Sequence, residues 1–577
     1  MRNRADDAFI TAARVTLDGM LERRPDLATE LGDHRHDDRL PAGTAGSYEE
    51  MLRWCGHRLD DLRAIDVGQL SPQNGVDLQI LANRLELIRF NTGEVREHEW
   101  NPMLANPGRA VYLLIARDFA PITERLRSVA RRLTAVPAAL GAARDVLGSM
   151  PKVHIETALT QFAGTANLIG AELDRVLTGL PGSAARQAEL AGPRSTALEA
   201  INEHRRWLQR RLDEAHHQGS RDPRIGADLF RHKLRLTLDA AADADEIVSR
   251  AEMNLEGVTE QIAETAGRLP GTSHGDAGSP RAGAGDRHPG DANGSAELVR
   301  QVLDRLAADA PEDNTILALV EKAFHKQCAF VREHALVTVY DDPVEVIEMP
   351  EIARGVAVAY CDPPGPLEGT PATTFVAVSP TPEDWTPERA RSFYREYNRH
   401  MIHNLMVHEA MPGHVLQLQH SRRFSGDTPV RAALRSGSFV EGWAVYAEQL
   451  MTSEGYPGEG NPDAVRMQQL KMQLRMIINA ILDARVHCEG VTEGEAMALM
   501  TGRGHQEEAE AAGKWRRLLL TSAQLSTYYV GFTEVSDLSA ELRAAHPGMV
   551  AQQLHDMMLA HGSPAARYLR TLCSPSP

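Results

Sequence analysis

The sequence contains few cysteines, and those present form no recognisable pattern. Its 577 residues include Cys55, Cys328, Cys361, Cys488 and Cys573. They are odd in number, far apart and without a C-x-x-C pair, which favours free thiols over a disulfide framework or a cysteine zinc site. Free thiols are typical of a reducing compartment, so we predict a cytoplasmic protein.

The chain also lacks long apolar runs and an excess of positive charge. Residues 1–21 carry acidic side chains and no continuous apolar core, so they indicate an amphipathic helix and no signal peptide. No uninterrupted apolar run has transmembrane length. The formal net charge of −17 argues against general nucleic-acid binding, which needs a basic surface. We therefore expect neither a membrane nor a nucleic acid as partner.

Helical periodicity dominates the first 270 residues. Residues 121–147 and 197–216 repeat apolar positions at intervals of three and four, as an amphipathic helix does. Proline and glycine at Pro137, at 181–182 and at 192–193 predict that short turns separate these helices.

Residues 270–296 contain Gly, Ser, Pro, Asp and Ala but no large apolar side chain. Such a segment cannot bury much surface, so we predict a disordered insertion or linker. It would separate an N-terminal helical region, 1–269, from a metal-site region, 297–577. We expect the two helical regions to form one compact unit.

Strand-like segments occur only between the linker and the motif described next. Residues 337–340, 356–360 and 374–378 are short, rich in β-branched side chains and bounded by proline or glycine. We predict a mainly α fold with a small antiparallel sheet.

The heptapeptide HEAMPGH, residues 408–414, carries the strongest chemical signal. In H-E-x-x-H zinc sites, two histidines one turn apart hold the ion beside a carboxylate. Here the second histidine comes two positions later, which would turn it about 120° away on a continuous helix. Pro412 interrupts the helix and Gly413 permits unusual backbone angles. We therefore predict that a kink brings His414 back to His408, so that both share one metal.

The third ligand is expected from residues 439–448, an apolar helix interrupted by Glu441 and Glu448. A buried carboxylate is costly unless it is paired or bound to metal. Glu441 is the candidate ligand, and Glu448 is a candidate for orienting a histidine. Alternatively, Ser438 and Glu441 form a capping box. His400 and His403 are expected at the surface or in a supporting role.

Together these segments resemble the bacterial domain-of-unknown-function 885 family, whose pattern is H-E-x-x-P-G-H followed by E-G-W-A-x-Y-x-E. Other likenesses are at residues 28–34, 39–41 and 360–364, at Asp483 and His487, and at 527–531, where the family has S-Y-K-I-G. The resemblance covers most of the chain.

The family is similar to helical zinc peptidases of the gluzincin type. This likeness implies a zincin-like architecture with two helical lobes around a cleft. It further implies one Zn²⁺ held by His408, His414 and Glu441, with Glu409 as general base and then acid. Tyr528 is the candidate donor to the developing oxyanion. Tyr529 competes with it, because Thr527-Tyr528-Tyr529 stands where Ser-Tyr-Lys is usual.

His487 is a weaker catalytic candidate, and a buried structural role is favoured for it. The predicted function is a zinc-dependent metallopeptidase that cleaves short peptides. A metal-dependent amidase acting on a small non-peptide amide is the alternative within enzymes. A non-catalytic metal- or ligand-binding protein and a metal-free helical scaffold are the others, although the intact Glu409 argues against a binder that performs no chemistry.

Overall fold

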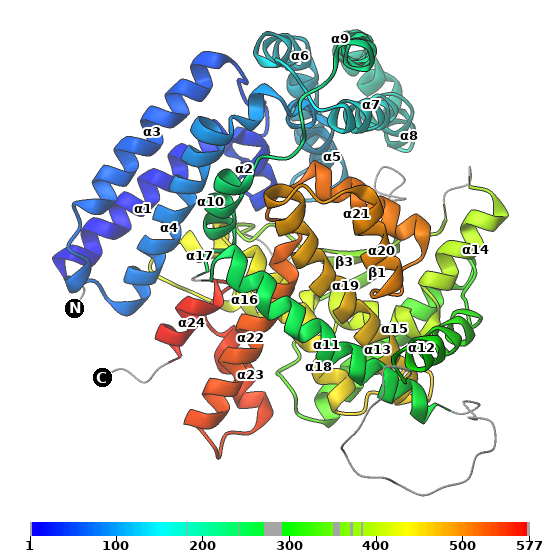
Figure 1. Cartoon of the computed structure of the whole chain (residues 1–577). Coiled ribbons are helices and arrows are strands. Elements are labelled where there is room, and N and C mark those ends of the chain that lie inside the picture. Colours follow the sequence, from blue (N-terminus) through cyan, green and yellow to red (C-terminus); the bar gives the residue numbers. More distant parts are fainter. Residues whose placement is uncertain are drawn as a thin grey trace, which may run out of the picture. The chain divides into compact units, whose positions relative to one another are not determined.

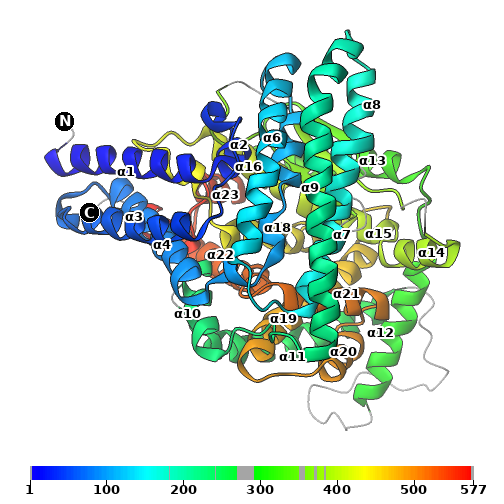
Figure 2. The same cartoon turned by 90° about the horizontal axis from the view of Figure 1, so that it is seen from above.

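The computed structural model describes residues 3–180, 182–240, 242–269, 291–349, 358–369, 373–381 and 385–573. It is 73% helix and 3% strand, which confirms the predicted mainly α class. None of the helices in these ranges is long and apolar enough to cross a lipid bilayer. Figures 1 and 2 show the arrangement of the elements.

The chain divides into two compact units. Unit 1 comprises Met1–Asp239, Pro364–Ala372 and Phe424–Arg435, and unit 2 comprises Ala240–Pro363, Thr373–Arg423 and Ser436–Pro577. The division therefore falls at 239/240, ahead of the segment 270–296. Residues 240–269 belong to unit 2 because helix α11 (Ala244–Arg268) packs against α19 (Pro462–Cys488).

The predicted linker is described only in part. Residues 270–290 lie outside the described residues, and residues 291–296 form the start of α12.

Unit 1 is built from helices. They are α1 (Arg4–Arg23), α2 (Pro25–Leu31), α3 (Ala45–Arg63), α4 (Pro72–Phe90), α5 (Gly108–Ala116), α6 (Ile122–Val146), α7 (Lys152–Asn167), α8 (Leu173–Thr178), α9 (Ser183–Gln218), α10 (Ala227–Leu238) and α17 (Val430–Ala433). Short turns of 3₁₀ or π type complete it: η1 (His34–His36), η2 (Val67–Gln69), η3 (Asn91–Val95), η4 (Glu97–Glu99), η5 (Pro102–Ala105) and η6 (Leu168–Glu172).

Two predicted breaks in unit 1 are wrong. Helix α6 continues through Pro137, and α9 continues through Gly192 and Pro193. An interior proline costs about 3 kcal/mol. Helix α6 packs against α9, beside which it lies in Figure 2. Its completely buried apolar side chains, which include Val129, Leu133, Val136 and Leu140, offset the cost of the proline.

Unit 2 contains the remaining helices. Besides α11 and α19 they are α12 (Asp291–Ala307), α13 (Ile316–Glu333), α14 (Pro387–Glu396), α15 (Arg399–Glu409), α16 (His414–Arg423), α18 (Gly437–Ser453), α20 (Glu493–Gly502), α21 (Glu508–Leu520), α22 (Ser526–Ala545), α23 (Ala551–Leu559) and α24 (Ala566–Leu572). Helix α19 contacts α11, α15, α18 and α22 and is buried on nearly all sides, so it forms the centre of the unit.

Unit 2 also contains a three-stranded sheet in the order β1–β3–β2, formed by Val344–Glu348, Thr374–Val378 and Ala359–Asp362. Strand β3 pairs antiparallel with β2 but parallel with β1, so the sheet is mixed and the prediction of a purely antiparallel sheet is wrong. The strand predicted at 374–378 is confirmed, and the one at 356–360 overlaps β2 where it is described.

The strand predicted at 337–340 is wrong, because those residues form no ladder. The backbone N–H of Thr338 donates to the Asp556 carboxylate at 2.9 Å, and the Thr338 hydroxyl donates to the same group at 2.6 Å. The Asp556 side chain, on α23, therefore accepts the hydrogen bond from a backbone N–H that a strand would use in its ladder.

Candidate metal centre

The turn between α15 and α16 is set by Pro412 and Gly413. Helix α15 ends at Glu409 and α16 begins at His414, as the proline predicted. The Gly413 N–H donates to the Val407 carbonyl at 2.9 Å. A Cβ at Gly413 would lie 1.9 Å from the His408 carbonyl oxygen, so only glycine allows this approach. The Met411–Pro412 peptide is cis.

Helix α18 holds the same turn from the other side. The indole Nε1 of Trp443, which is completely buried, donates to the Pro412 carbonyl at 2.8 Å. The tryptophan of the EGWA segment thus ties α18 to the turn that positions His414.

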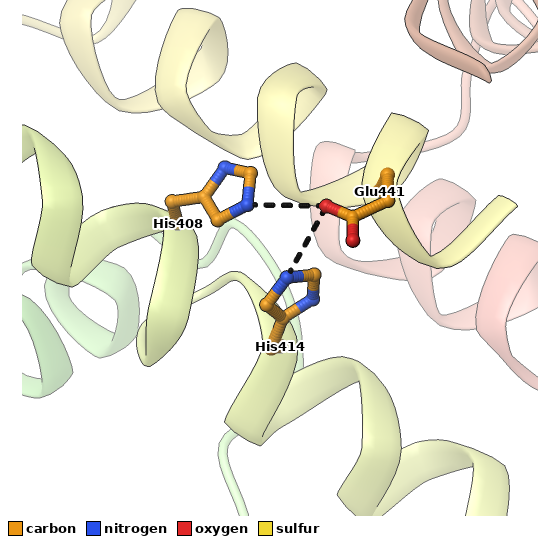
Figure 3. A group of neighbouring side chains, drawn as sticks. All are labelled: His408, His414 and Glu441. Carbon is orange, nitrogen blue, oxygen red and sulfur yellow. Dashed lines mark ion pairs between the residues drawn. The ribbon is translucent and has the colours of Figure 1, made fainter. Parts of the chain in front are cut away.

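The structure brings the three predicted ligands together. The imidazole centroids of His408 and His414 lie 4.7 Å apart at an interplanar angle of 84°. Their Nε2 atoms lie 3.4 and 3.6 Å from the same oxygen, Oε2 of Glu441 (Figure 3). All three ligand atoms lie within 4.8 Å of one another, and no other such group of His, Cys, Asp or Glu is found in the described ranges.

Glu441 does not cap its helix. The N-cap of α18 is Ser436, whose hydroxyl accepts from the Phe439 N–H, while Ser438 is buried within the first turn. The capping box proposed for Ser438 and Glu441 is therefore wrong, and the Glu441 carboxylate is left for the histidines.

The triad contains buried polar atoms that have no hydrogen-bond partner in the described part of the chain. Oε2 of Glu441 lies near both imidazoles but makes no geometrically sound hydrogen bond, and Nδ1 of His414 has none either. A buried, unsatisfied carboxylate oxygen is costly in free energy. A cation shared by the three side chains would remove that cost at Glu441.

Glu448 orients His408, as predicted. Its Oε1 lies 2.7 Å from Nδ1 of His408, and its Oε2 accepts from the Asn404 amide at 2.6 Å. A proton on Nδ1 that points at Glu448 leaves the lone pair of Nε2 directed toward Glu441 and an ion. Asn404 lies one turn before His408, and sequence reasoning did not identify it.

The charges of His408 and Glu441 stabilise each other. Burial alone would lower the pKa of His408, but its interactions with Glu441 and Glu448 outweigh burial and raise the pKa well above the usual value. Burial would raise the pKa of Glu441, yet the two histidines hold it well below the usual range. The centre thus stabilises an ionised carboxylate beside a positive charge.

Glu409 is partly buried beside the candidate ligands and is held by the sheet. Its Oε2 accepts from the backbone N–H of Cys361 on β2 at 3.1 Å. Burial raises the pKa of Glu409, although the charges of His414 and His408 oppose the shift. This carboxylate therefore takes up a proton more readily than an exposed glutamate. The spacing of residues in the sequence gives no indication that the Cys361 N–H contacts Glu409.

The structure distinguishes the two tyrosines of α22. Tyr529 is buried, and its hydroxyl accepts from the Asn254 amide of α11 at 2.9 Å. The negative charge of Glu441, followed by burial, raises the pKa of Tyr528, while a hydrogen bond with Arg517 opposes the shift. The pKa of Tyr528 therefore responds to the charge of Glu441, whereas the Tyr529 hydroxyl is engaged with α11.

Two glycines allow the helices that carry Glu441 and Tyr528 to approach each other closely. Helices α18 and α22 pack closely (Figure 1). A Cβ on Gly442 would lie 2.2 Å from the Gly531 carbonyl carbon, and one on Gly531 would lie 1.8 Å from the Ser438 carbonyl oxygen. The backbones therefore touch where side chains would normally separate them.

Asp483 holds the beginning of α22. Its carboxylate accepts from the backbone N–H groups of Ala523 and Ser526 at 3.2 and 3.0 Å and from the Ser526 hydroxyl at 2.8 Å. These bonds satisfy donors that the first turn leaves open, and they fix the segment that carries Tyr528.

The remaining histidines have other partners. His487 is buried with Nε2 3.0 Å from the Thr521 carbonyl oxygen, the structural role that the sequence favoured. His403 is also buried, between the Tyr456 hydroxyl at 2.9 Å and Glu459 at 3.0 Å. His400 lies 3.6 Å from Asp309. None of these three belongs to the triad.

Similar solved structures span the whole chain. A candidate lipoprotein of unknown function from Shewanella oneidensis is 28% identical, with a TM-score of 0.80 over 98% of this chain and 99% of the other. A candidate lipoprotein from Colwellia psychrerythraea is 15% identical and shares the fold, with a TM-score of 0.76 over 99% of this chain and 98% of the other.

No curated protein matches the chain. A family model, described as "Bacterial protein of unknown function (DUF885)", matches residues 25–572. Since this match covers nearly the entire sequence, the chain belongs to the bacterial DUF885 family.

Proposed function

We propose that this protein is a zinc-dependent hydrolase that cleaves short peptides with an activated water molecule. The observation that carries the proposal is the convergence of His408, His414 and Glu441, with a buried carboxylate oxygen left without a hydrogen bond. Two imidazoles and one carboxylate are a common donor set for catalytic zinc, with a position left for water. The side chains therefore fit the ion.

The roles of the surrounding residues follow from their contacts. A bound Zn²⁺ would lower the pKa of a water molecule to about 7 and act as a Lewis acid on the substrate carbonyl. Glu409, held by the Cys361 N–H, accepts the proton of the attacking water and returns it to the departing nitrogen. Glu448 and Asn404 keep the Nε2 atom of His408 available as a ligand.

Tyr528 is the proposed donor to the oxygen of the tetrahedral intermediate. It lies in the field of Glu441, and Asp483 fixes the start of its helix. The phenol donates a hydrogen bond where negative charge develops. The zincin-like architecture and a substrate cleft between helical lobes belong to this proposal, supported by the resemblance of the motifs.

A cytoplasmic location also remains a proposal. All five cysteines are free thiols, as expected in a reducing compartment. The description of the two similar structures as candidate lipoproteins points instead to the cell envelope. Fractionation of cells that carry the untagged gene product would distinguish the two compartments.

Glu409→Gln tests the chemistry. We expect the variant to retain about one zinc ion per chain and to lose peptide cleavage by about 100-fold to 10,000-fold, the usual contribution of a general base. Metal is measured by mass spectrometry on protein purified without a His-tag, and cleavage by product analysis on a short-peptide library. Glu454→Gln, at an exposed position just after α18, is the matched control.

Absence of zinc from the wild-type protein would contradict the proposal. Cleavage by the Glu409→Gln variant at the wild-type rate would show that Glu409 is not the general base. Cleavage of small non-peptide amides without cleavage of peptides would establish the amidase alternative.

A further inference from the structure

A cavity of about 100 Å³ lies within unit 1. It is lined by helices α2, α3, α5 and α6 and by the turns η4 and η5. Leu104 is part of the lining and is 58% exposed, so the cavity opens to solvent. None of the described residues around it belongs to the candidate metal centre. The cavity therefore needs an explanation of its own.

Small side chains of α6 leave the apolar part of the cavity open. Ala139 and Ala143 lie one turn apart on the same face of this helix, and the buried Leu140 and Leu147 also line the cavity. An apolar cavity of about 150 Å³ binds benzene. A cavity of about 100 Å³ therefore suits a smaller group, such as a branched aliphatic chain of about four carbon atoms.

Two aromatic side chains of the lining have polar atoms to spare. The rings of Tyr48 and His98 stack on each other with their centroids 3.8 Å apart. Neither the Tyr48 hydroxyl nor a ring nitrogen of His98 has a hydrogen bond to a described residue, since Nε2 of His98 comes only within 3.9 Å of Glu99. Only 11% of the His98 side chain is exposed. A phenol and an imidazole are thus available to a bound molecule.

The Asn106 side chain supplies a donor in a fixed orientation. Its Oδ1 accepts from the Gly108 N–H at 2.9 Å and from the Thr165 hydroxyl at 2.7 Å. Its NH2 group has no hydrogen bond to a described residue, and Asn106 lines the cavity. The amide nitrogen is therefore the end of this side chain that remains for a bound molecule.

The charges around the cavity are paired. Asp26 is the one acidic residue in the described lining, which contains no lysine or arginine. Both carboxylate oxygens of Asp26 accept from the Arg24 guanidinium, at 3.0 and 2.8 Å. Burial would raise the pKa of Asp26, but the contact with Arg24 lowers it, and burial lowers the pKa of His98. At neutral pH the described lining therefore presents no unpaired charge.

We propose that this cavity binds a small uncharged molecule in which an amide group is joined to a branched aliphatic chain. The amide carbonyl accepts from the Tyr48 hydroxyl and the Asn106 NH2 group, and the amide nitrogen donates to His98. The aliphatic chain leaves water and packs against Ala139 and Ala143. A carboxylate or an ammonium would lose its hydration without gaining a free counter-ion. This site does not depend on the proposed hydrolase activity.

Three probes of the same shape test the proposal. They are 3-methylbutanamide, 3-methylbutanoate and 3-methylbutanamidinium, which carry a neutral, a negative and a positive end. The full-length Glu409→Gln protein is used, so that the proposed base cannot hydrolyse the amide, and binding is titrated by ligand-observed NMR. We expect a Kd of about 0.1 to 5 mM for the amide, a range suited to about seven non-hydrogen atoms. Both ions should bind about 10-fold more weakly or less.

Acetamide tests the apolar part of the cavity. It keeps the amide group but lacks the aliphatic chain, so it should bind about 10-fold to 100-fold more weakly than 3-methylbutanamide. No binding of 3-methylbutanamide at about 20 mM would overturn the proposal. Binding of either ion as tightly as the amide would also overturn it, because the site would then recognise charge.

A matched pair of variants places the probe in the cavity. Ala143→Leu fills the apolar space and should abolish binding of 3-methylbutanamide. Ala138→Leu adds the same side chain at an exposed position of α6 and should leave the Kd unchanged. Equal binding by the two variants would place the probe elsewhere, for example at the metal centre, and would contradict the proposal.

Tyr48→Phe tests the polar contact without disturbing the fold. The variant keeps the ring that stacks on His98 and removes only a hydroxyl that has no hydrogen bond to a described residue. We expect the melting temperature to stay the same and the Kd for 3-methylbutanamide to rise about 3-fold to 10-fold, as when one neutral hydrogen bond is lost. An unchanged Kd would show that Tyr48 does not contact the amide and would contradict the proposed arrangement.

Discussion

Two histidines of this protein, one in each unit, each lie between two carboxylates. In unit 1, His34 has Nδ1 at 2.9 Å from Asp37 and Nε2 at 3.2 Å from Glu368. In unit 2, His408 has Nδ1 at 2.7 Å from Glu448 and Nε2 at 3.4 Å from Glu441. By residue type the two sites are nearly the same.

They differ in whether their polar atoms are satisfied. At His34 both ring nitrogens are hydrogen-bonded, Asp37 also accepts from the Thr29 hydroxyl at 2.6 Å, and the Phe119 ring stacks on the imidazole at 3.6 Å. At His408 the shared Glu441 oxygen has no hydrogen bond to any described residue, and a second imidazole faces it. The first arrangement is complete, whereas the second has room for the ion that we propose. Unsatisfied atoms therefore identify the site better than residue types do.

The strongest test of this difference compares Glu441→Gln, at the His408 site, with Glu368→Gln, at the His34 site. We expect Glu441→Gln to weaken zinc binding by more than about 100-fold, because a ligand matters more than the groups that orient one. Glu368→Gln should leave zinc affinity unchanged. Titration against a chelating dye measures both. Equal affinities in the two variants would show that Glu441 is no ligand.

Glu448→Gln is expected to have an intermediate effect. The amide still contacts His408 but loses the charge that holds the Nδ1 proton, so zinc affinity should fall by about 10-fold to 100-fold. The same dye titration measures it, with Glu454→Gln as the control. A larger loss than in Glu441→Gln would reverse the assigned roles of the two glutamates.

The smallest effect is expected at His34, as a pH-dependent change in stability. Burial would lower the pKa of His34, but its bonds to Asp37 and Glu368 raise it to about 9. Because the folded state binds this proton more tightly, the stabilisation is fully present below pH ~6.5 and is lost as the pH rises through about 9. It amounts to about 1–3 kcal/mol.

Thermal melting of the wild-type protein and His34→Gln checks this expectation. The wild-type protein should melt a few degrees higher at pH 6, and the difference should disappear by pH ~10. A difference that grows with pH would show that His34 is neutral when folded. Zinc content should stay the same in both proteins.

Much of the candidate site could be predicted because its chemistry is local in sequence. The HEAMPGH spacing with a helix breaker predicts that His408 and His414 lie together, and the next apolar helix supplies the candidate ligand Glu441 and, in Glu448, the carboxylate that contacts His408. The Cys361 N–H and the Asp483 bonds could not be predicted. Every residue type except proline carries the same backbone N–H, so the sequence does not mark which one is used. Partners that are distant in sequence also leave no short motif that could be recognised.

The errors in the fold have a similar origin. The strand predicted at 337–340 has the right composition, but its backbone donor is taken by Asp556, more than 200 positions later. Pro137 and Pro193 are helix breakers by propensity, and the packing between α6 and α9 overrides them. Propensity describes a residue with its neighbours in sequence, whereas these outcomes depend on contacts in space.

The contact between Gly442 and Gly531 also limits how the site can move. Where two backbones touch, sliding of α18 along α22 by a fraction of a turn would force a carbonyl into a Cα. Glu441 and Tyr528 therefore keep a fixed separation, without a hinge between them. In the proposed hydrolase, any closure around a substrate would come from other elements and would leave the candidate ligands and Tyr528 stationary.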